Sequence, residues 1–243
     1  MKKVTTAFIL GAGFGTRLKP LTNQCPKPLL RIGGRPIITY VFDHLIQTGI
    51  QRIIINTHHL HHIYDQTFPE REWKGIPLIF RHEHPEILDT GGGVRNIIDL
   101  VQEDENLIVY NGDIMTNLPI EKLLHHHFMK SSEVTLALRS KNGPLHVNTD
   151  ENGQIVDIRH ELKRPSARDC LFASIYVVQT SFLNRIPPNT KISVISTFLD
   201  MLRKKESINS LLIDEGHWSD IGTHDEFNRI QKAYEKQAPH DSK

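Results

Sequence analysis

Apolar residues gather in short continuous runs that are separated by segments with helical spacing. The runs at residues 7–10, 52–56, 76–80 and 107–110 predict strands that are buried on both faces of a sheet. Residues 37–47 have the apolar spacing of a helix that ends before Gly49, and residues 94–101 predict a second helix. Strands that alternate with helices predict parallel pairing through right-handed crossovers.

The pattern changes from about residue 133 onward. Residues 133–139 alternate apolar and polar side chains, residues 147–158 surround a turn typical of a β-hairpin, and residues 171–178 predict a further strand. We therefore expect antiparallel strands that continue the same sheet, then a helix from about Thr223 and a frayed polar tail at 235–243. The predicted fold class is α/β, with a mixed, mostly parallel central sheet and helices on both faces.

Composition excludes several classes of protein. The 243 residues include 29 Lys and Arg against 28 Asp and Glu, so no global basic field favours nucleic acid or an anionic membrane. Cys25 and Cys170 have no paired or metal-like spacing. The apolar run at 7–10 is too short for a signal-peptide core or a membrane span, so we expect a soluble, cytoplasmic protein.

A glycine-rich segment follows the first predicted strand and carries the strongest chemical signal. Gly11, Gly13 and Gly15 allow close approach of a ligand to the backbone, while Arg17 and Lys27 supply cations suited to phosphates. Taken alone, the glycines are equally consistent with an ordinary turn beside surface cations. Neither the dinucleotide fingerprint nor the Walker motif is present, because Thr16 follows Gly15 and no Gly-Lys-Ser/Thr sequence follows.

The longer string, G-A-G-F-G-T-R-L-K-P-L-T followed by P-K-P-L, resembles the signature of sugar-1-phosphate nucleotidyltransferases. Further similar motifs follow in the family's order at residues 33–38, 90–93, 111–113 and 218–222. The resemblance covers roughly residues 7 to 230 and implies a three-layer, Rossmann-like nucleotidyltransferase fold. It also implies one domain over 1–243, with a nucleotide-binding half at 1–130 and a sugar-phosphate-binding half at 131–234.

The same resemblance implies roles for individual residues. Arg17 and Lys27 are expected to be catalytic, and Asp113 and Asp220 to bind Mg²⁺. The expected nucleotide-binding residues are Gly11, Ala12, Gly13, Gly15, Thr16, Gly91, Gly92 and Asn111. Each motif also has a purely structural interpretation: a turn that ends a strand at 111–113, a helix cap at 90–93, and an N-cap before the helix near Thr223.

Two positions depart from the family pattern. Residues 161–165 are similar to the E-K-P motif, whose lysine corresponds to Lys163, but Phe172 replaces the family's sugar-phosphate asparagine and Ser174 its glycine. Lys163, Phe172 and Ser174 are therefore the candidate sugar-phosphate residues. Phe172 and the Thr-Gly-Gly-Gly loop are most similar to N-acetylmuramate 1-phosphate uridylyltransferases, with mannose- and heptose-1-phosphate guanylyltransferases as the alternative.

The implied reaction is transfer of a nucleoside monophosphate from a nucleoside triphosphate to a sugar 1-phosphate, by a monomer or homodimer. One rival is a regulatory paralogue that binds a nucleotide sugar without catalysis. A nicotinamide oxidoreductase is disfavoured, because Asn56 stands where an acidic residue would end the second strand. Histidines at 58–62 and 125–127 offer a metal site if His58 and His62 share a helix face, but we interpret both clusters as solvated surface.

Overall fold

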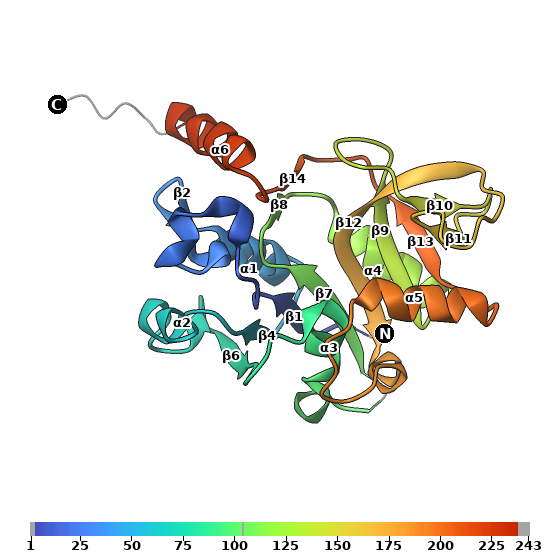
Figure 1. Cartoon of the computed structure of the whole chain (residues 1–243), viewed down its shortest axis with the longest axis horizontal. Coiled ribbons are helices and arrows are strands. Elements are labelled where there is room, and N and C mark those ends of the chain that lie inside the picture. Colours follow the sequence, from blue (N-terminus) through green and yellow to red (C-terminus); the bar gives the residue numbers. More distant parts are fainter. Residues whose placement is uncertain (1–2, 104, 238–243) are drawn as a thin grey trace.

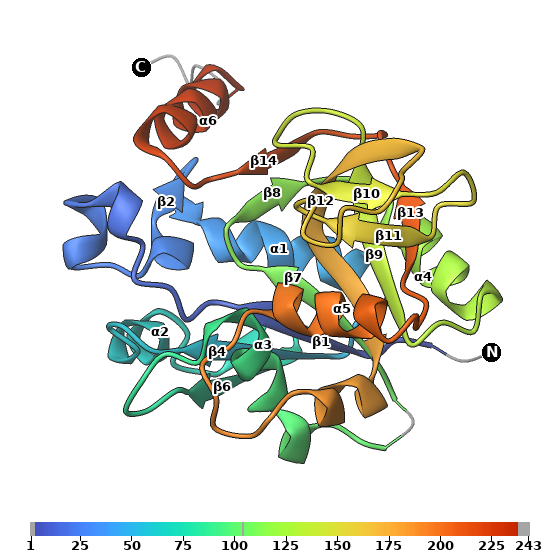
Figure 2. The same ribbon diagram turned by 45° about the vertical axis from the view of Figure 1, so that its right-hand side comes forward.

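A ten-stranded mixed sheet runs through both halves of the chain (Figures 1 and 2). The computed structural model describes residues 3–103 and 105–237. Its parallel part has the order β7 (Asn106–Asn111), β1 (Thr6–Leu10), β4 (Arg52–Thr57) and β6 (Ile76–His82). These are the four strands predicted from continuous apolar runs, and the prediction is confirmed.

The second half adds antiparallel strands to the same sheet. The long strand β12 (Arg168–Gln179) pairs antiparallel with β7 and with β9 (Val134–Arg139), and β13 (Asn209–Leu212) lies parallel to β9. The predicted hairpin is β10 (Val147–Thr149) with β11 (Ile155–Ile158). At the other edge, β5 (Glu72–Trp73) pairs with β6.

Helices cover both faces of the sheet, as predicted. Ala7 and Ile9 of β1 point into one apolar cluster with α1 (Ile37–Gln47), α2 (His62–Thr67) and α4 (Ile120–Met129). Phe8 points the opposite way, into a second cluster with α3 (Asp89–Arg95) and α5 (Val194–Arg203). Because successive side chains of β1 point to opposite faces of the sheet, this one strand contributes to both apolar cores of a three-layer fold.

A small ribbon lies outside the main sheet. It consists of β8 (Ile114–Thr116) and β14 (Trp218–Asp220), which pair antiparallel. The C-terminal helix α6 (His224–Gln237) follows β14 and contributes Ile230 to a third apolar cluster, with Leu18 and Ile32 of the N-terminal loops. A two-residue ladder of β2 (Arg31–Ile32) and β3 (Arg35–Pro36) lies in that N-terminal region.

Three local expectations were wrong. The helix predicted at 94–101 is α3, which begins at Asp89 and is followed by a 3₁₀ turn at Ile98–Leu100. It begins early because its glycines allow close packing: a Cβ at Gly92 would lie 2.2 Å from the carbonyl oxygen of Thr190. At the C-terminus, α6 extends through residues 235–237, whereas residues 238–243 lie outside the described part of the chain.

The third correction concerns the histidines. His58 precedes α2, which begins only at His62, so the two do not share a helix face. His127 is not on the surface: it is 1% exposed and hydrogen-bonded to Thr135 Oγ1 and Asn106 Oδ1, both at 2.9 Å. The helical period placed one histidine of the 125–127 run toward the sheet.

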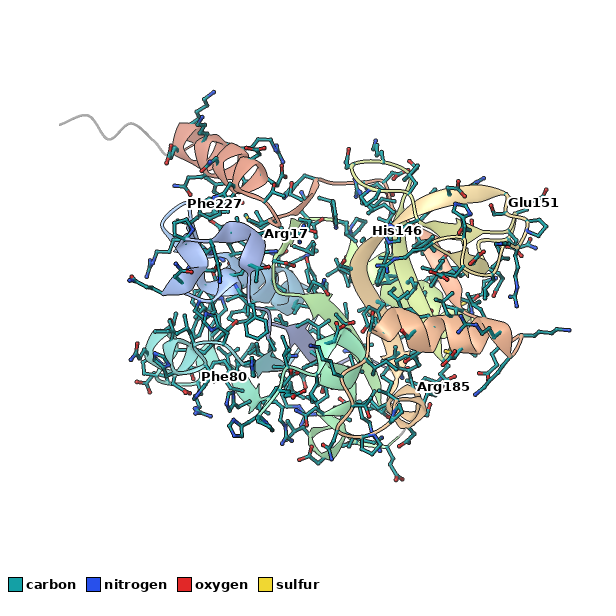
Figure 3. The ribbon with its side chains drawn as sticks, in the orientation of Figure 1. Arg17, Phe80, His146, Glu151, Arg185 and Phe227 are labelled. Carbon is teal, nitrogen blue, oxygen red and sulfur yellow. The ribbon has the colours of Figure 1, made fainter. Side chains whose placement is uncertain are left out.

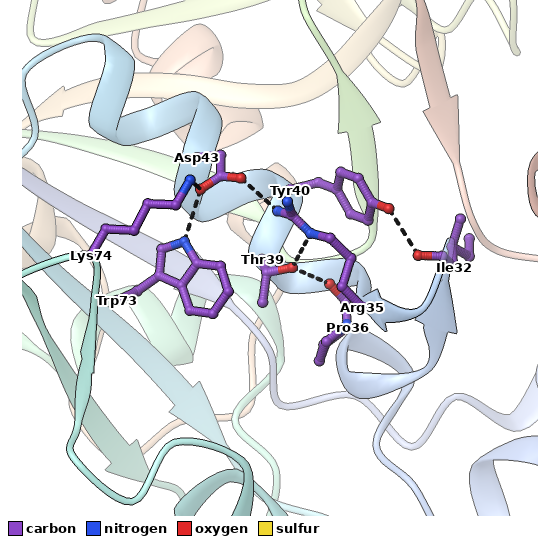
Figure 4. A network of polar contacts seen from close by, with 8 residues as sticks. All are labelled: Ile32, Arg35, Pro36, Thr39, Tyr40, Asp43, Trp73 and Lys74. Atoms are coloured by element: carbon purple, nitrogen blue, oxygen red, sulfur yellow. Dashed lines mark hydrogen bonds and ion pairs between the residues drawn. The ribbon is translucent and has the colours of Figure 1, made fainter. Parts of the chain in front are cut away.

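A polar network fastens α1 to the sheet edge (Figure 4). Asp43 accepts hydrogen bonds from Arg35 at 2.7 Å and from the indole of Trp73 at 2.8 Å, and pairs with Lys74 at 2.8 Å. Although partial burial opposes ionisation, these donors lower the pKa of the Asp43 carboxyl. Between residues 3 and 237, as far as they are described, no helix is long and apolar enough to cross a membrane.

Candidate active site

The glycine-rich loop after β1 is shaped by a buried polar network that the sequence did not reveal. Asn56, near the end of β4, accepts hydrogen bonds from the N–H groups of Gly11 at 2.7 Å and Ala12 at 3.3 Å. Its amide nitrogen donates to Glu83 at 2.7 Å, and Glu83 also accepts the Leu88 N–H at 2.7 Å. Burial raises the pKa of the Glu83 carboxyl. Asn56 and Glu83 are 2% and 1% exposed. In the sequence, the only sign of this network is a polar residue, Asn56, near the end of a mostly apolar strand, since a buried polar group needs hydrogen-bond partners.

This network changes which backbone groups the loop offers to a ligand. The N–H groups of Gly11 and Ala12 are occupied by Asn56, and that of Gly13 donates to the Gly11 carbonyl at 3.0 Å. In the described part of the chain, the N–H groups of Phe14 and Gly15 have no partner. Gly15 is left-handed at φ 60°, a conformation that suits an anion-binding turn. Phosphate oxygens would therefore meet the second half of the loop.

A cavity of about 360 Å³ opens beside this loop at the carboxyl ends of β1, β4 and β7. It is lined by Leu10, Ala12, Gly13, Phe14, Asn56, Ile87, Asp89, Thr90, Asn111, Asp113 and Lys191. Four predicted residues (Ala12, Gly13, Asn111 and Asp113) thus come together in one wall. Gly11, Gly15 and Thr16 belong to the same loop without lining the cavity.

Gly91 and Gly92 lie behind the cavity rather than in its wall. Both of their N–H groups donate to the Ile192 carbonyl, at 2.8 and 3.1 Å. A Cβ at Gly91 would lie 2.8 Å from that same oxygen. These glycines therefore dock the start of α3 onto the segment before α5, and their contact with a nucleotide stays a prediction.

The two predicted metal ligands are neighbours because of the β8–β14 ribbon. Asp113 follows β7, and Asp220 ends β14 opposite Ile114 in the ladder. Lys27, 9% exposed, donates a hydrogen bond to Asp113, and its ammonium nitrogen lies 3.7 Å from Asp220 Oδ1. Burial and the Asp113 charge raise the pKa of the Asp220 carboxyl, opposed by Lys27 and Arg17.

Arg17 and Asp220 both approach the backbone of Gly222. A Cβ at Gly222 would lie 3.0 Å from Arg17 Nη2 and 3.1 Å from Asp220 Oδ1, so a larger residue there would crowd both side chains. Figure 3 places Arg17 below α6, the helix that carries Phe227. The structure therefore brings Lys27 into contact with both carboxylates, and Arg17 near enough to Asp220 for its charge to act on that carboxyl.

A second, larger groove of about 1010 Å³ lies on the Asp220 side. Its walls are the loop at residues 142–144, strand β14 and helix α6. Asp113 lines the smaller cavity and Asp220 the larger groove. The carboxylate pair thus stands between two spaces that are each large enough for a ligand.

The candidate sugar-phosphate residues line neither space. Phe172 and Ser174 lie on β12 where its pairing with β9 shifts register, and Ser174 is left-handed at φ 60°. The Trp218 indole donates to the Ala173 carbonyl at 2.9 Å, which ties this bulge to β14. Lys163 lies in a loop held by Asp157, whose buried carboxylate accepts the N–H groups of Ile158, Leu162 and Arg164.

The donor set at the carboxylate pair fits a hard divalent cation. Among the described residues, no group of three or more His, Cys, Asp or Glu side chains is placed to hold a metal. Mg²⁺ is typically held by one or two carboxylates together with substrate phosphates, whereas structural zinc needs four protein ligands. Burial and then the charge of Asp113 raise the pKa of Asp220, and a bound cation would offset both by favouring the charged carboxylates.

The sequence and the fold of this chain are both similar to those of known proteins. Residues 6–237 match the protein family described as Nucleotidyl transferase. The chain is 30% identical over 228 residues to a mannose-1-phosphate guanylyltransferase from Mycobacterium tuberculosis, an alignment that covers 92% of this chain and 62% of that enzyme. It is 25% identical over 226 residues to the D-glycero-alpha-D-manno-heptose 1-phosphate guanylyltransferase of Aneurinibacillus thermoaerophilus, covering 93% of this chain and 96% of that enzyme. HddC from Yersinia pseudotuberculosis, in complex with GMP-PN, shares the fold with a TM-score of 0.77 at 20% identity, over 95% of this chain and 100% of HddC.

Proposed function

Because the chain belongs to the nucleotidyl transferase family, we propose that it transfers a nucleoside monophosphate from a nucleoside triphosphate to a sugar 1-phosphate, releasing pyrophosphate. The observation that carries this proposal is the cluster of Lys27, Arg17, Asp113 and Asp220 between two cavities. The chain spans about three fifths of the mannose enzymes it resembles, with 62% of the Mycobacterium enzyme covered. Because part of those enzymes has no counterpart in this alignment, we base the proposed activity on the residues of this chain's own site.

For the base, the favoured donor is GTP. Asp89 lines the smaller cavity, and its Oδ1 accepts the Thr90 N–H at 2.6 Å, which leaves Oδ2 for a ligand. A carboxylate oxygen accepts from the N1–H and the amino group of guanine, whose donors are adjacent. Uracil offers a single N–H flanked by two carbonyl oxygens, which repel a carboxylate. The relatives named as guanylyltransferases support the same base.

For the acceptor, the favoured substrate is mannose or a manno-configured heptose 1-phosphate, following the names of those relatives. We place the nucleoside in the smaller cavity and the acceptor in the groove beside Asp220. A second candidate is UTP with N-acetylmuramate 1-phosphate, favoured by Phe172 and the Thr90-Gly91-Gly92-Gly93 loop.

The reaction needs little from the protein beyond positioning and charge. A phosphate oxygen of the acceptor attacks the α-phosphorus, and the bond to the bridging oxygen of pyrophosphate breaks in line. The attacking phosphate is already ionised near neutral pH, so no general base is required. Asp113 and Asp220 would hold Mg²⁺, which when bound neutralises charge on the phosphates. Arg17 would balance charge on the β- and γ-phosphates, and Lys27, on its flexible stem, charge at the α-phosphate.

The test is a pyrophosphate-release assay with purified protein and Mg²⁺. GTP and UTP are each paired with mannose 1-phosphate, heptose 1-phosphate and N-acetylmuramate 1-phosphate. We expect the highest kcat/KM with GTP and a manno-configured acceptor, and Asp89→Ala should reduce the preference for GTP over UTP. A maximum with UTP and N-acetylmuramate 1-phosphate would establish the second candidate, and no release with any pair would reject the activity.

A further inference from the structure

Arg139 is a fully buried arginine whose terminal nitrogens all bind backbone. It ends β9 and is 0% exposed. Nη1 donates to the carbonyls of Ile213 and Glu215 at 3.2 and 3.1 Å, and Nη2 to those of Asp214 and Gly216 at 3.3 and 3.2 Å. One guanidinium therefore holds four successive carbonyl groups.

In the described part of the chain, no carboxylate lies within salt-bridge distance of this charge. Across residues 3–103 and 105–237, no ion pair includes Arg139, and the nearby Asp214 carboxylate accepts from the Ser140 N–H and hydroxyl instead. A buried charge without hydrogen bonds is strongly unfavourable. The four carbonyl dipoles compensate it only while residues 213–216 keep their turn. Arg139 and this turn therefore fix each other.

The turn leads directly into the strand that carries Asp220. Residues 213–217 connect β13 of the main sheet to β14 of the ribbon. The turn is also held by the residue that follows β8: the His217 N–H donates to Asn117 Oδ1 at 2.8 Å. Gly216 has φ 73°, and a Cβ there would lie 2.5 Å from that same oxygen. The start of β14 is thus clamped between Arg139 and Asn117.

We infer that Arg139 is a positioning residue for the cation site, acting through the 213–217 turn on Asp220. The inference rests on the proposed function, because the position of Asp220 matters only if it binds a cation with Asp113. Strand β14 has three residues and pairs only with β8 in the described structure, so the ladder alone holds it weakly. A metal site needs its ligands placed to within about 0.5 Å, and loss of a group that orients a metal ligand typically costs about 10- to 100-fold in metal affinity, which sets the scale expected for Arg139.

The experiment compares wild type with Arg139→Lys and Arg139→Met in the full chain. Mn²⁺ binding is titrated by electron paramagnetic resonance without substrates, and the Mg²⁺ concentration for half-maximal activity is measured separately. We expect Arg139→Met to weaken Mn²⁺ binding about 10- to 100-fold, and Arg139→Lys to lie between, since an ammonium offers three donors for four carbonyls. Arg139→Ala should regain Mn²⁺ affinity when millimolar guanidinium ion is added.

A matched control lies at the other end of the same strand. Arg185 pairs with Glu133, the residue before β9, at 2.6 Å and with Glu206 at 2.6 Å. Arg185→Met should lower thermal stability without changing Mn²⁺ affinity. If Arg139→Met does not fold, Asn117→Ala releases the same turn from its other side and must weaken Mn²⁺ binding in the same way.

If the folded Arg139 variants bind Mn²⁺ as tightly as wild type, the inference is wrong and the proposed function stands. The same holds for Asn117→Ala if the Arg139 variants do not fold. A wild-type protein that neither binds Mn²⁺ nor transfers a nucleotide would overturn the proposed function, and the inference with it.

Discussion

The backbone N–H of Ile221 donates a hydrogen bond to the carbonyl oxygen of Asp113 at 3.0 Å. This bond continues the β8–β14 ladder beyond the pairing of Asp220 with Ile114. Main-chain hydrogen bonds therefore set the register between two carboxylates from distant parts of the sequence, while the turn at residues 213–217 anchors the start of β14. A pair fixed in this way is pre-organised for a cation and two phosphates.

The first prediction concerns this pair. Asp113→Asn and Asp220→Asn should each lower kcat at least about 100-fold, which corresponds to about 3 kcal/mol of lost transition-state stabilisation. The measurement is kcat across a Mg²⁺ titration. Asp200→Asn serves as the control, because among the described residues Asp200 forms an ion pair only with Arg203, on the surface of α5. Near wild-type turnover in Asp113→Asn would remove that residue from the mechanism.

The second prediction concerns Asn56. Asn56→Ala removes the acceptor for Gly11 and Ala12 and leaves Glu83 without one donor. Buried groups left unpaired cost about 1–3 kcal/mol each, and a loosened loop should raise KM for the nucleoside triphosphate about tenfold or more. KM for the sugar phosphate should change little.

The control for Asn56 is another buried asparagine outside the site. Asn148 is 0% exposed and donates to Asp169 at 2.6 Å, so Asn148→Ala should lower stability without changing KM for the triphosphate. Equal KM values in Asn56→Ala and wild type would show that the network supports only the fold.

The sequence predicted the parallel strands well because β1, β4 and β7 are buried on both faces, which leaves a continuous apolar run such as Ile53–Ile55, whereas β6, nearer the edge, is only partly buried. The motif resemblance predicted that Asp113 and Asp220 lie together, but the residues alone could not show how, because their proximity depends on a three-residue ribbon. It missed Asn56, Glu83 and Arg139 because their roles lie in long-range bonds to backbone groups, and no local spacing encodes such bonds. It assigned the histidines to the surface because a run of three hides which member faces the sheet.

The third prediction is a pH dependence of stability caused by His127. Burial, with a smaller contribution from His126, lowers the pKa of His127 from 6.5 to about 4. Between those two pH values the unfolded chain takes up a proton that the folded protein does not, so stability is complete above about pH 6.5 and falls as pH decreases. The loss attributable to His127 is about 3 kcal/mol by pH 4.

His127→Gln removes this titration while keeping an amide that can bond to Thr135 and Asn106. Urea unfolding at pH 7.5 and pH 5 should show a smaller decrease in the variant than in wild type. The other histidines titrate in both proteins and cancel in the difference. Identical decreases would exclude His127 as a source of acid sensitivity.

The fourth prediction separates strain from chemistry at Ser174. Its left-handed backbone at φ 60° costs a non-glycine residue about 1 kcal/mol, which Ser174→Gly should recover in part. Ser174→Ala loses the same hydroxyl but keeps the strained backbone. If the hydroxyl contacts the sugar, both variants should change acceptor preference, whereas only Ser174→Gly should raise the unfolding temperature. Unchanged preference in both would limit Ser174 to a structural role.

The last prediction separates triphosphate binding from sugar recognition. Arg17 and Lys27 lie at the carboxylate pair, where phosphates common to all substrates would bind, so Arg17→Ala and Lys27→Ala should impair reaction with every acceptor. Each lost charge-assisted contact should cost about 1.5–3 kcal/mol. Phe172 lies on β12 in the second half, where Phe172→Asn exchanges an apolar surface for an amide and should change discrimination between sugars by about 10- to 200-fold. A matrix of kcat/KM values for the three variants against several sugar 1-phosphates makes the comparison. The assignment of the two halves of the site is wrong if Phe172→Asn changes kcat/KM by the same factor for all acceptors, or if Arg17→Ala lowers kcat/KM for only one of them. A contact with a phosphate that all substrates share cannot select a sugar.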